Sequence, residues 1–116
     1  MDKKIKGLLD NVVKTQRVQS YAETDGVTLT LRNRDDFVWT DVKININPTF
    51  GYMGGYEYRV KEMRSGGEII VPLREFANPQ GERLNPFEIK LQRLALRCKT
   101  AEGIGVDESS WPSKTN

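Results

Sequence analysis

The sequence predicts an all-β protein, an immunoglobulin-like antiparallel β-sandwich of about seven strands, for two reasons. First, polar and apolar residues alternate in several short runs along the chain, which is the period of a half-buried strand. Second, turn signals rich in glycine, proline and asparagine separate these runs at intervals of roughly 8–15 residues, a spacing typical of sandwiches and barrels. We therefore expect two sheets packed around one core.

The first predicted pair of strands lies on either side of Asp25-Gly26. Residues 18–24 form one strand, and Val27, Leu29 and Leu31 alternate with polar residues to form the other. An Asp-Gly dipeptide favours a two-residue hairpin, because glycine adopts positive φ angles without strain. We expect the two strands to pair in antiparallel fashion.

The next predicted strand, residues 37–47, changes its phase midway. Trp39 has an odd number, whereas Ile44 and Ile46 have even numbers, so a regular strand cannot place all three on one face. The sequence therefore predicts a β-bulge, or a change of sheet, at Thr40–Asp41. We interpret Trp39, beside this irregularity, as an anchor of the core.

Four more strands are predicted further along the chain, and a long irregular connection interrupts them. The four strands comprise residues 56–61, 68–73, 94–98 and 103–107. In the connection, residues 74–89, two Asn-Pro dipeptides mark turns. We expect Phe76, Leu84 and Phe87 to anchor this connection to the core.

The predicted domain comprises residues 18–108, between an N-terminal segment, residues 1–17, and a tail, residues 109–116. In the N-terminal segment, apolar residues such as Ile5 and Val12 recur at helical intervals among lysines, which favours a short basic amphipathic helix. Such a helix could lie on a membrane or dock on a partner. Alternatively, the segment packs on its own domain as a helix or a strand, or it is a frayed terminus.

Composition narrows the classes of function. The 116 residues suffice for one domain, and a net charge of +2 gives no strong case for nucleic acid. No run of about 18 apolar residues is present to form a membrane-spanning helix, so we expect a soluble chain. The absence of histidine removes the commonest general base and the commonest transition-metal ligand. We therefore expect no catalysis, no cofactor and no metal.

The strongest candidate for a ligand-binding site is the glycine- and aromatic-rich stretch after Pro48. Aromatic faces bind sugar rings, nucleobases and partner side chains, and a nearby arginine adds a cation for such a platform. The candidate residues are Phe50, Tyr52, Tyr56, Tyr58 and Arg59. The alternative is a hairpin tip whose tyrosines alternate between core and solvent.

A group of basic residues is a second candidate. Arg93, Arg97 and Lys99 share one face of a predicted strand, and Arg59 and Lys61 are close together on another. Together they would form a basic patch for an acidic glycan, an anionic lipid or nucleic acid. The alternative is a solvated polar face without a ligand.

Two further groups have a structural interpretation beside a chemical one. Asp35, Asp36 and Asp41 offer the oxygen ligands that calcium prefers, but turn chemistry also explains three acids at a corner. Cys98 alternates in phase with the leucines of its strand, so we interpret it as a buried apolar residue and not as a nucleophile. As the only cysteine, it excludes an internal disulfide.

Three stretches of the sequence resemble small immunoglobulin-like sandwich domains of bacterial envelope proteins, of the FxLYD-like type. They are Asn33–Asn47, Ser65–Phe76 and Asn78–Asn85, within a match over residues 27–98. In this type of domain, a strand that ends in asparagine precedes a strand of alternating apolar residues, and a Gly-Glu turn opens a later strand. The resemblance implies an envelope-located, usually membrane-anchored parent protein, and it supplies no catalytic residues.

These observations favour a non-catalytic binding or structural module that recognises a protein or a glycan, either through loops or at a sheet edge. Two alternatives stay open: a carbohydrate-processing enzyme that uses acids and tyrosines, and a single-stranded nucleic-acid binder built on a small barrel. Two carboxylates facing each other across a cleft would favour the enzyme. Binding that weakens steeply with salt would favour the nucleic-acid binder.

Overall fold

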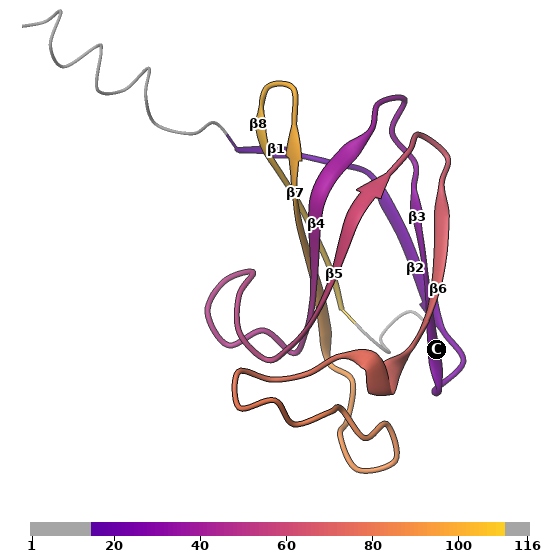
Figure 1. Cartoon of the computed structure of the whole chain (residues 1–116), viewed down its shortest axis with the longest axis vertical. Helices are drawn as coiled ribbons and strands as arrows, with labels where there is room; N and C mark the ends of the chain where they lie inside the picture. The colour runs from indigo at the N-terminus through magenta and orange to yellow at the C-terminus, as the bar shows by residue number, and fades with distance from the viewer. Residues whose placement is uncertain (1–14, 111–116) are drawn as a thin grey trace, which may run out of the picture.

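The structure, a computed structural model, describes residues 15–110 of the chain and is almost entirely β (Figure 1). Its strands form two sheets, and the only helical element among the described residues is a single 3-10 turn. The elements are β1 (Thr15–Arg17), β2 (Ser20–Thr24), β3 (Thr28–Asn33), β4 (Trp39–Ile46), β5 (Tyr56–Met63), β6 (Glu68–Pro72), the 3-10 turn η1 (Leu73–Glu75), β7 (Arg93–Thr100) and β8 (Gly103–Ser110).

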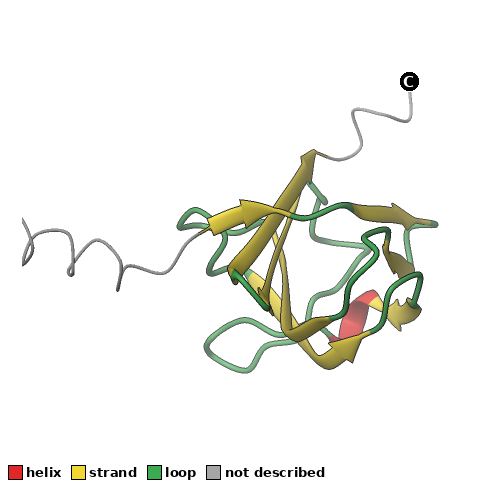
Figure 2. Cartoon of the chain, turned by 90° about the horizontal axis from the view of Figure 1, so that it is seen from above, coloured by secondary structure: helices red, strands yellow, loops and turns green. Residues whose placement is uncertain are grey.

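The strand order confirms the predicted sandwich. One sheet has the order β2-β3-β6, and the other has the order β1-β8-β7-β4-β5. The chain crosses between the sheets after β1, β3, β5 and β6, whereas β2-β3, β4-β5 and β7-β8 are antiparallel pairs within one sheet. Seen from above, the strands surround a single interior (Figure 2). No helix among residues 15–110 is long and apolar enough to cross a membrane.

The hairpin predicted at Asp25-Gly26 joins β2 to β3, and these strands pair in antiparallel register from Ser20–Asn33 to Thr24–Leu29. Gly26 has a φ of 94°. The Asp25 carboxylate accepts hydrogen bonds from the backbone N–H groups of Thr28 (2.7 Å) and Val27 (2.9 Å), and these bonds lower its pKa. The side chain thus stabilises the turn locally.

The predicted bulge lies in β4. The register between β4 and β7 shifts between Thr40 and Lys43, and Asp41 has a φ of 47°, in the left-handed region. The extra residue shifts the alternation by one position, so that even-numbered residues face the core in the second half of the strand. As a result, both Trp39 and Ile44 are fully buried, which the phase change in the sequence had required.

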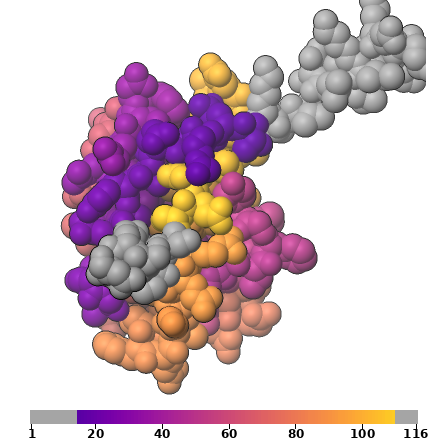
Figure 3. Space-filling view, turned by 180° about the vertical axis from the view of Figure 1, so that it is seen from behind, coloured from indigo at the N-terminus to yellow at the C-terminus, as the bar shows by residue number. Residues whose placement is uncertain are grey.

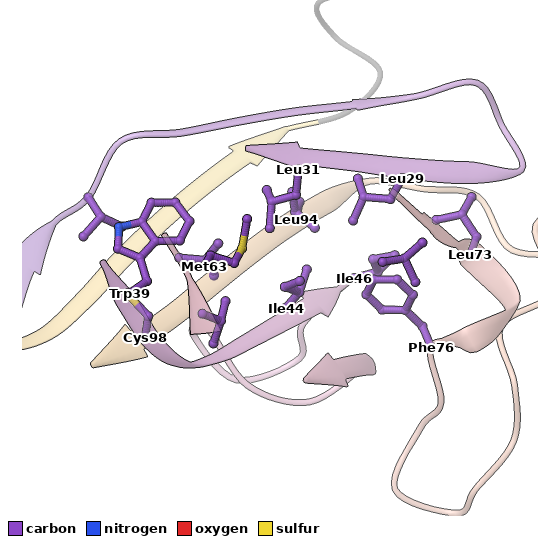
Figure 4. Packing of buried hydrophobic residues seen from close by; sticks show 14 of the residues in the cluster. Leu29, Leu31, Trp39, Ile44, Ile46, Met63, Leu73, Phe76, Leu94 and Cys98 are labelled. Carbon is purple, nitrogen blue, oxygen red and sulfur yellow. The ribbon is translucent and has the colours of Figure 1, made fainter. Parts of the chain in front are cut away.

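The core fills the space between the sheets (Figure 4). Leu29 from β3, Ile44 from β4 and Leu96 from β7 belong to one buried cluster. Trp39 and Cys98 lie at one end of it, as Figure 4 shows, and Phe76 lies at the other. The core anchor predicted at Trp39 and the burial predicted for Cys98 are confirmed.

One predicted anchor of the long connection is wrong. Phe76 and Leu84 are buried, but Phe87 is 85% exposed. The physical reason is a local turn: Asn85 accepts hydrogen bonds from the backbone N–H groups of Phe87 (to Oδ1, 3.0 Å) and Ile89 (to its carbonyl, 2.9 Å). After this turn Ile89, and not Phe87, packs against the core.

Both ends of the described chain are strands. β1 pairs in parallel with β8, and Figure 3 shows the indigo N-terminal strands against yellow β8. The last strand was predicted to end at Asp107 but continues to Ser110. The helix expected within residues 1–17 falls mainly on residues 1–14, outside the described part, as do residues 111–116 of the expected tail.

Candidate functional site

The outer face of the larger sheet carries a row of cations. Along β4, the residues Val42, Ile44 and Ile46 point to the core, so Lys43 points to the opposite face. In the sheet register, Lys43 lies directly opposite Arg59 of β5 and Arg97 of β7. Directly opposed residues share a face, so three cations lie side by side across three strands.

Neighbouring positions extend this row to a larger surface. Residues an even number of positions apart on a regular strand share a face, so Arg93 and Lys99 lie on the face of Arg97 on β7. Lys61 of β5 lines one hollow together with Lys43 and Arg59. We call this surface the basic face. Its members are Lys43, Arg59, Lys61, Arg93, Arg97 and Lys99. The predicted basic patch is thereby brought together, with Lys43 as a member that the prediction omitted.

Several of these cations are held by ion pairs. Arg93 contacts Glu108 at 2.9 Å, and Lys99 contacts Asp41 at 3.1 Å. Lys43 and Lys61 form no ion pair with any residue of the described range 15–110. Their charges are therefore free to attract an anionic partner.

Glu57 is the acidic centre of the face. Its carboxylate accepts a hydrogen bond from Arg59 Nε (2.5 Å) and one from Asn45 Nδ2 (3.3 Å), and Arg97 lies 4.0 Å away. Burial raises the pKa of Glu57, but these hydrogen bonds and the charges of Arg59 and Arg97 outweigh it and lower the pKa overall. Glu57 therefore holds both arginines in place as an anion.

A hollow of about 400 Å³ opens beside Glu57, a volume within the range of small ligand sites. Its lining includes Asn45, Met53, Glu57, Arg59, Ala77 and Pro79. Asn45 is only 1% exposed and donates from Nδ2 to the carbonyl of Gly54 (2.8 Å). Among the described residues, Asn45 Oδ1 has no hydrogen-bond partner, and neither has the Nε of Arg93 or Arg97.

The structure does not bring the predicted aromatic residues together into one platform. Phe50 lies in the loop between β4 and β5 and is 80% exposed, while Tyr52 is half-buried there. Tyr56 and Tyr58 pack against the core, with the Tyr58 ring 5.4 Å from that of Phe76. Because Arg59 follows Tyr58 in a strand, it points to the opposite face.

The loop itself is a tight structure that holds two apolar side chains in solvent. Phe50 and Met53 exchange backbone hydrogen bonds of 2.9 and 2.7 Å, and Met53 is also exposed. A Cβ atom on Gly54 would lie 2.1 Å from Thr49 Oγ1, and one on Gly55 would lie 2.3 Å from the Asn47 carbonyl. These glycines permit the close chain approach that shapes the hollow.

Asp35, Asp41 and Cys98 have structural roles, whereas Asp36 is exposed. Asp35 accepts hydrogen bonds from the Gln19 N–H and from Trp39 Nε1, and Asp41 pairs with Lys99. Residues 15–110 contain no group of three acidic, histidine or cysteine side chains placed to hold a metal ion. Burial, the largest cause, raises the pKa of Cys98 to about 11, so its reactive thiolate is scarce at neutral pH.

Lys43, Asn45 and Glu57 were not among the predicted site residues. The alternation around Ile44 already indicated an outward Lys43 and Asn45, but their neighbours on other strands depend on the register. Chemically, the face can hold an anion by charge and by arginine hydrogen bonds, beside a hollow with an apolar wall.

Comparison of the chain with protein-family models, with curated proteins and with solved structures gives no match.

Proposed function

We propose that the protein is a non-catalytic binding module that holds an anionic partner, a protein or a glycan, on its basic face. The row of Lys43, Arg59 and Arg97 in direct register carries this proposal. Adjacent strands lie about 4.8 Å apart, so the row concentrates positive charge on one surface. The Glu57 carboxylate offsets part of the repulsion among these three like charges, and an anionic partner relieves the rest.

The support for the cations is rigid. Asn45 donates to Glu57, and Glu57 in turn accepts from Arg59 and lies 4.0 Å from Arg97, so less side-chain entropy is lost when a partner binds. Lys43 and Lys61 form no ion pair within residues 15–110, so they add positive charge to the face. This combination favours recognition of an anion over a merely solvated face.

We also propose, from the resemblance to FxLYD-like domains, that the module belongs to a bacterial envelope-associated protein. The immunoglobulin-like strand order is consistent with this origin. Sandwich domains of this kind bind ligands through loops held on a rigid scaffold, or at sheet edges. In such a parent, the basic face would serve recognition at the cell envelope.

The test is binding of defined polyanions by isothermal titration calorimetry. Polygalacturonate and poly-glutamate serve as anionic glycan and peptide probes, and dextran serves as the neutral glycan. We expect both anionic probes to bind, with affinity that falls as salt screens the charges, and we expect no binding of dextran. Lys43→Glu should weaken binding by about tenfold or more, as for reversal of a charge in a complementary interface.

The matched control is Arg74→Glu. It changes the net charge equally, but Arg74 lies beside Val27 in a groove at the end of the sandwich, away from the basic face. We expect this variant to bind within about twofold of the original protein. Equal losses in both variants, or the absence of binding to either polyanion, would overturn the proposal.

A further inference from the structure

A hollow of about 420 Å³ lies where β4 and β5 depart from regular pairing. The ladder between the two strands omits the pair Asp41–Lys61, and Asp41 has a φ of 47°. β5 changes phase here as well, because Val60 packs against the core and so does Met63, three residues later. The lining of this β4–β5 hollow consists of residues 41–43 and residues 59–61.

Three cations line the β4–β5 hollow, namely Lys43, Arg59 and Lys61. Lys43 is half-buried and Lys61 is exposed, and neither forms an ion pair with a residue of the range 15–110. The acid in the lining, Asp41, contacts Lys99 at 3.1 Å. The hollow is therefore positively charged, and its one acid is already paired with a lysine outside it.

Arg59 is held with one side of its guanidinium group occupied. Its Nε donates to the Glu57 carboxylate across 2.5 Å, so the paired N–H groups that include Nε are not free for a second carboxylate. Within residues 15–110, its terminal nitrogens make no hydrogen bond to another side chain. These terminal N–H groups are the ones that a ligand in the hollow can use.

The arrangement of the three cations favours a tetrahedral anion. A carboxylate has two oxygens in one plane, whereas a sulfate ester has three terminal oxygens, one for each cation. A lysine ammonium is a compact charge with three rotatable donors, so it can approach such an oxygen from any side. The volume lies within the range of small ligand sites, which leaves room for part of the sugar ring that bears the sulfate.

The cations continue beyond the hollow across the sheet. Lys43 lies directly opposite Arg97 of β7, and Arg93 lies further along the same strand. The Nε atoms of both arginines are buried and have no hydrogen-bond partner among the described residues. A surface with several cation positions suits a polymer that repeats its anionic groups, as a sulfated glycan does, better than a single modified side chain of a protein.

We propose that the β4–β5 hollow is a sulfate site and that the anionic partner is a sulfated glycan. One sulfate ester lies between Lys43, Arg59 and Lys61, and further anionic groups of the glycan lie over the basic face. The inference rests on the proposed anion-binding function and names the class of ligand.

The test compares oligosaccharides of equal length and charge by isothermal titration calorimetry. The hexasaccharide of chondroitin 4-sulfate carries three carboxylates and three sulfates, and hexagalacturonate carries six carboxylates. We expect the sulfated hexasaccharide to bind about tenfold more tightly at the same salt concentration, because a third cation makes a charge-assisted hydrogen bond to sulfate. Non-sulfated chondroitin hexasaccharide, with half the charge, should bind more weakly than either.

A pair of lysine variants tests the protein side. Lys61→Ala removes a cation from the hollow, and Lys90→Ala removes an exposed lysine of the long connection that is outside the lining. Lys61→Ala should reduce the preference for the sulfated hexasaccharide over hexagalacturonate to about twofold or less, whereas Lys90→Ala should preserve it. Because Lys61 is exposed, we expect both variants to keep the melting temperature of the original protein.

The outcomes separate this inference from the proposed function. Equal affinity for the two charge-matched oligosaccharides, or a preference for sulfate that survives Lys61→Ala, would overturn the sulfate site and leave the binding of anions to the basic face. A peptide with three phosphoserines that bound more tightly than the sulfated hexasaccharide would overturn the assignment to a glycan. If neither these probes nor the anionic polymers bind, both proposals fail.

Discussion

The side-chain amide of Asn33 donates to the backbone carbonyl of Met63 across 3.0 Å, and so joins the end of β3 in one sheet to the end of β5 in the other. The same Nδ2 donates to the Phe37 carbonyl (2.9 Å), and Oδ1 accepts from the Asp35 N–H (2.8 Å). Asn33 is fully buried. Its hydrogen bonds hold the corner between the two sheets, where water has no access.

Replacement of Asn33 by alanine should lower the free energy of unfolding by about 3 kcal/mol, since it leaves buried backbone groups without partners. Urea denaturation followed by tryptophan fluorescence measures this change, because Trp39 is buried nearby in the same corner. Thr30→Ala, on the outward face of the same strand, is the control and should change stability by less than about 1 kcal/mol. A loss below about 1 kcal/mol for Asn33→Ala would contradict the role assigned to it.

Gly105 lets β8 approach the first segment of the chain. A Cβ atom at Gly105 would lie 2.4 Å from Val18 Cγ1 and 3.0 Å from Cys98 Sγ. Gly105→Ala should therefore destabilise the fold by about 1–3 kcal/mol through overpacking. In a Val18→Ala background the same substitution should cost less, because the closest atom is gone, and a double-mutant cycle in urea measures the coupling. Additive effects would show that the close approach is unimportant.

Asp41 carries the backbone strain of the β4 bulge, with its φ of 47°. Asp41→Asn should be tolerated within about 0.5 kcal/mol, because asparagine adopts the left-handed conformation readily. Asp41→Val should cost about 1–2 kcal/mol, because a β-branched residue is strained there. Both variants lose the exposed ion pair with Lys99, so their difference in thermal denaturation reports the backbone alone. Equal stability of the two variants would exclude a strained bulge.

The lowered pKa of Glu57 predicts a pH dependence of stability. The folded state favours the ionised carboxylate, so its contribution is present above the ordinary pKa of 4.5 and is lost as the pH falls through the lower folded value. Relative to Glu57→Gln, the original protein should therefore be more stable at pH 7, and this advantage should shrink towards pH 3. Urea denaturation of both proteins across this range measures it.

The Arg59→Gln background provides the control for this pH dependence. Arg59 supplies a hydrogen bond and a charge that lower the pKa of Glu57. Without Arg59, the difference between Glu57 and its glutamine variant should vary less with pH. A difference that grows as the pH falls would mean that the folded protein prefers the protonated acid, contrary to the geometry.

Most of the fold could be predicted because its signals are local. The Asp25-Gly26 turn, the bulge at Thr40–Asp41 and the burial of Trp39 each follow from a few adjacent residues. The exposure of Phe87 could not be predicted, because an apolar residue in an irregular connection carries no period. There, a hydrogen-bonded turn at Asn85 decided the direction of the side chain.

The candidate site was predictable only in part. That Arg93, Arg97 and Lys99 share a face follows from the alternation in one strand. The same rule places Arg59 and Tyr58 on different faces of their strand. Because Tyr58 packs inward, Arg59 points away from the aromatic residues. Which tyrosines point inward depends on the position of β5 in the sheet.

By itself, the sequence determined that this chain forms strands, where they turn and which side chains of each strand share a face, because the two-residue period is a property of the local backbone. Only the tertiary structure decided that Lys43 lies between Arg59 and Arg97 and that Ala77 pairs with Glu57. These relationships join residues far apart in the chain, and they are set by sheet register, which depends on the packing of the whole core.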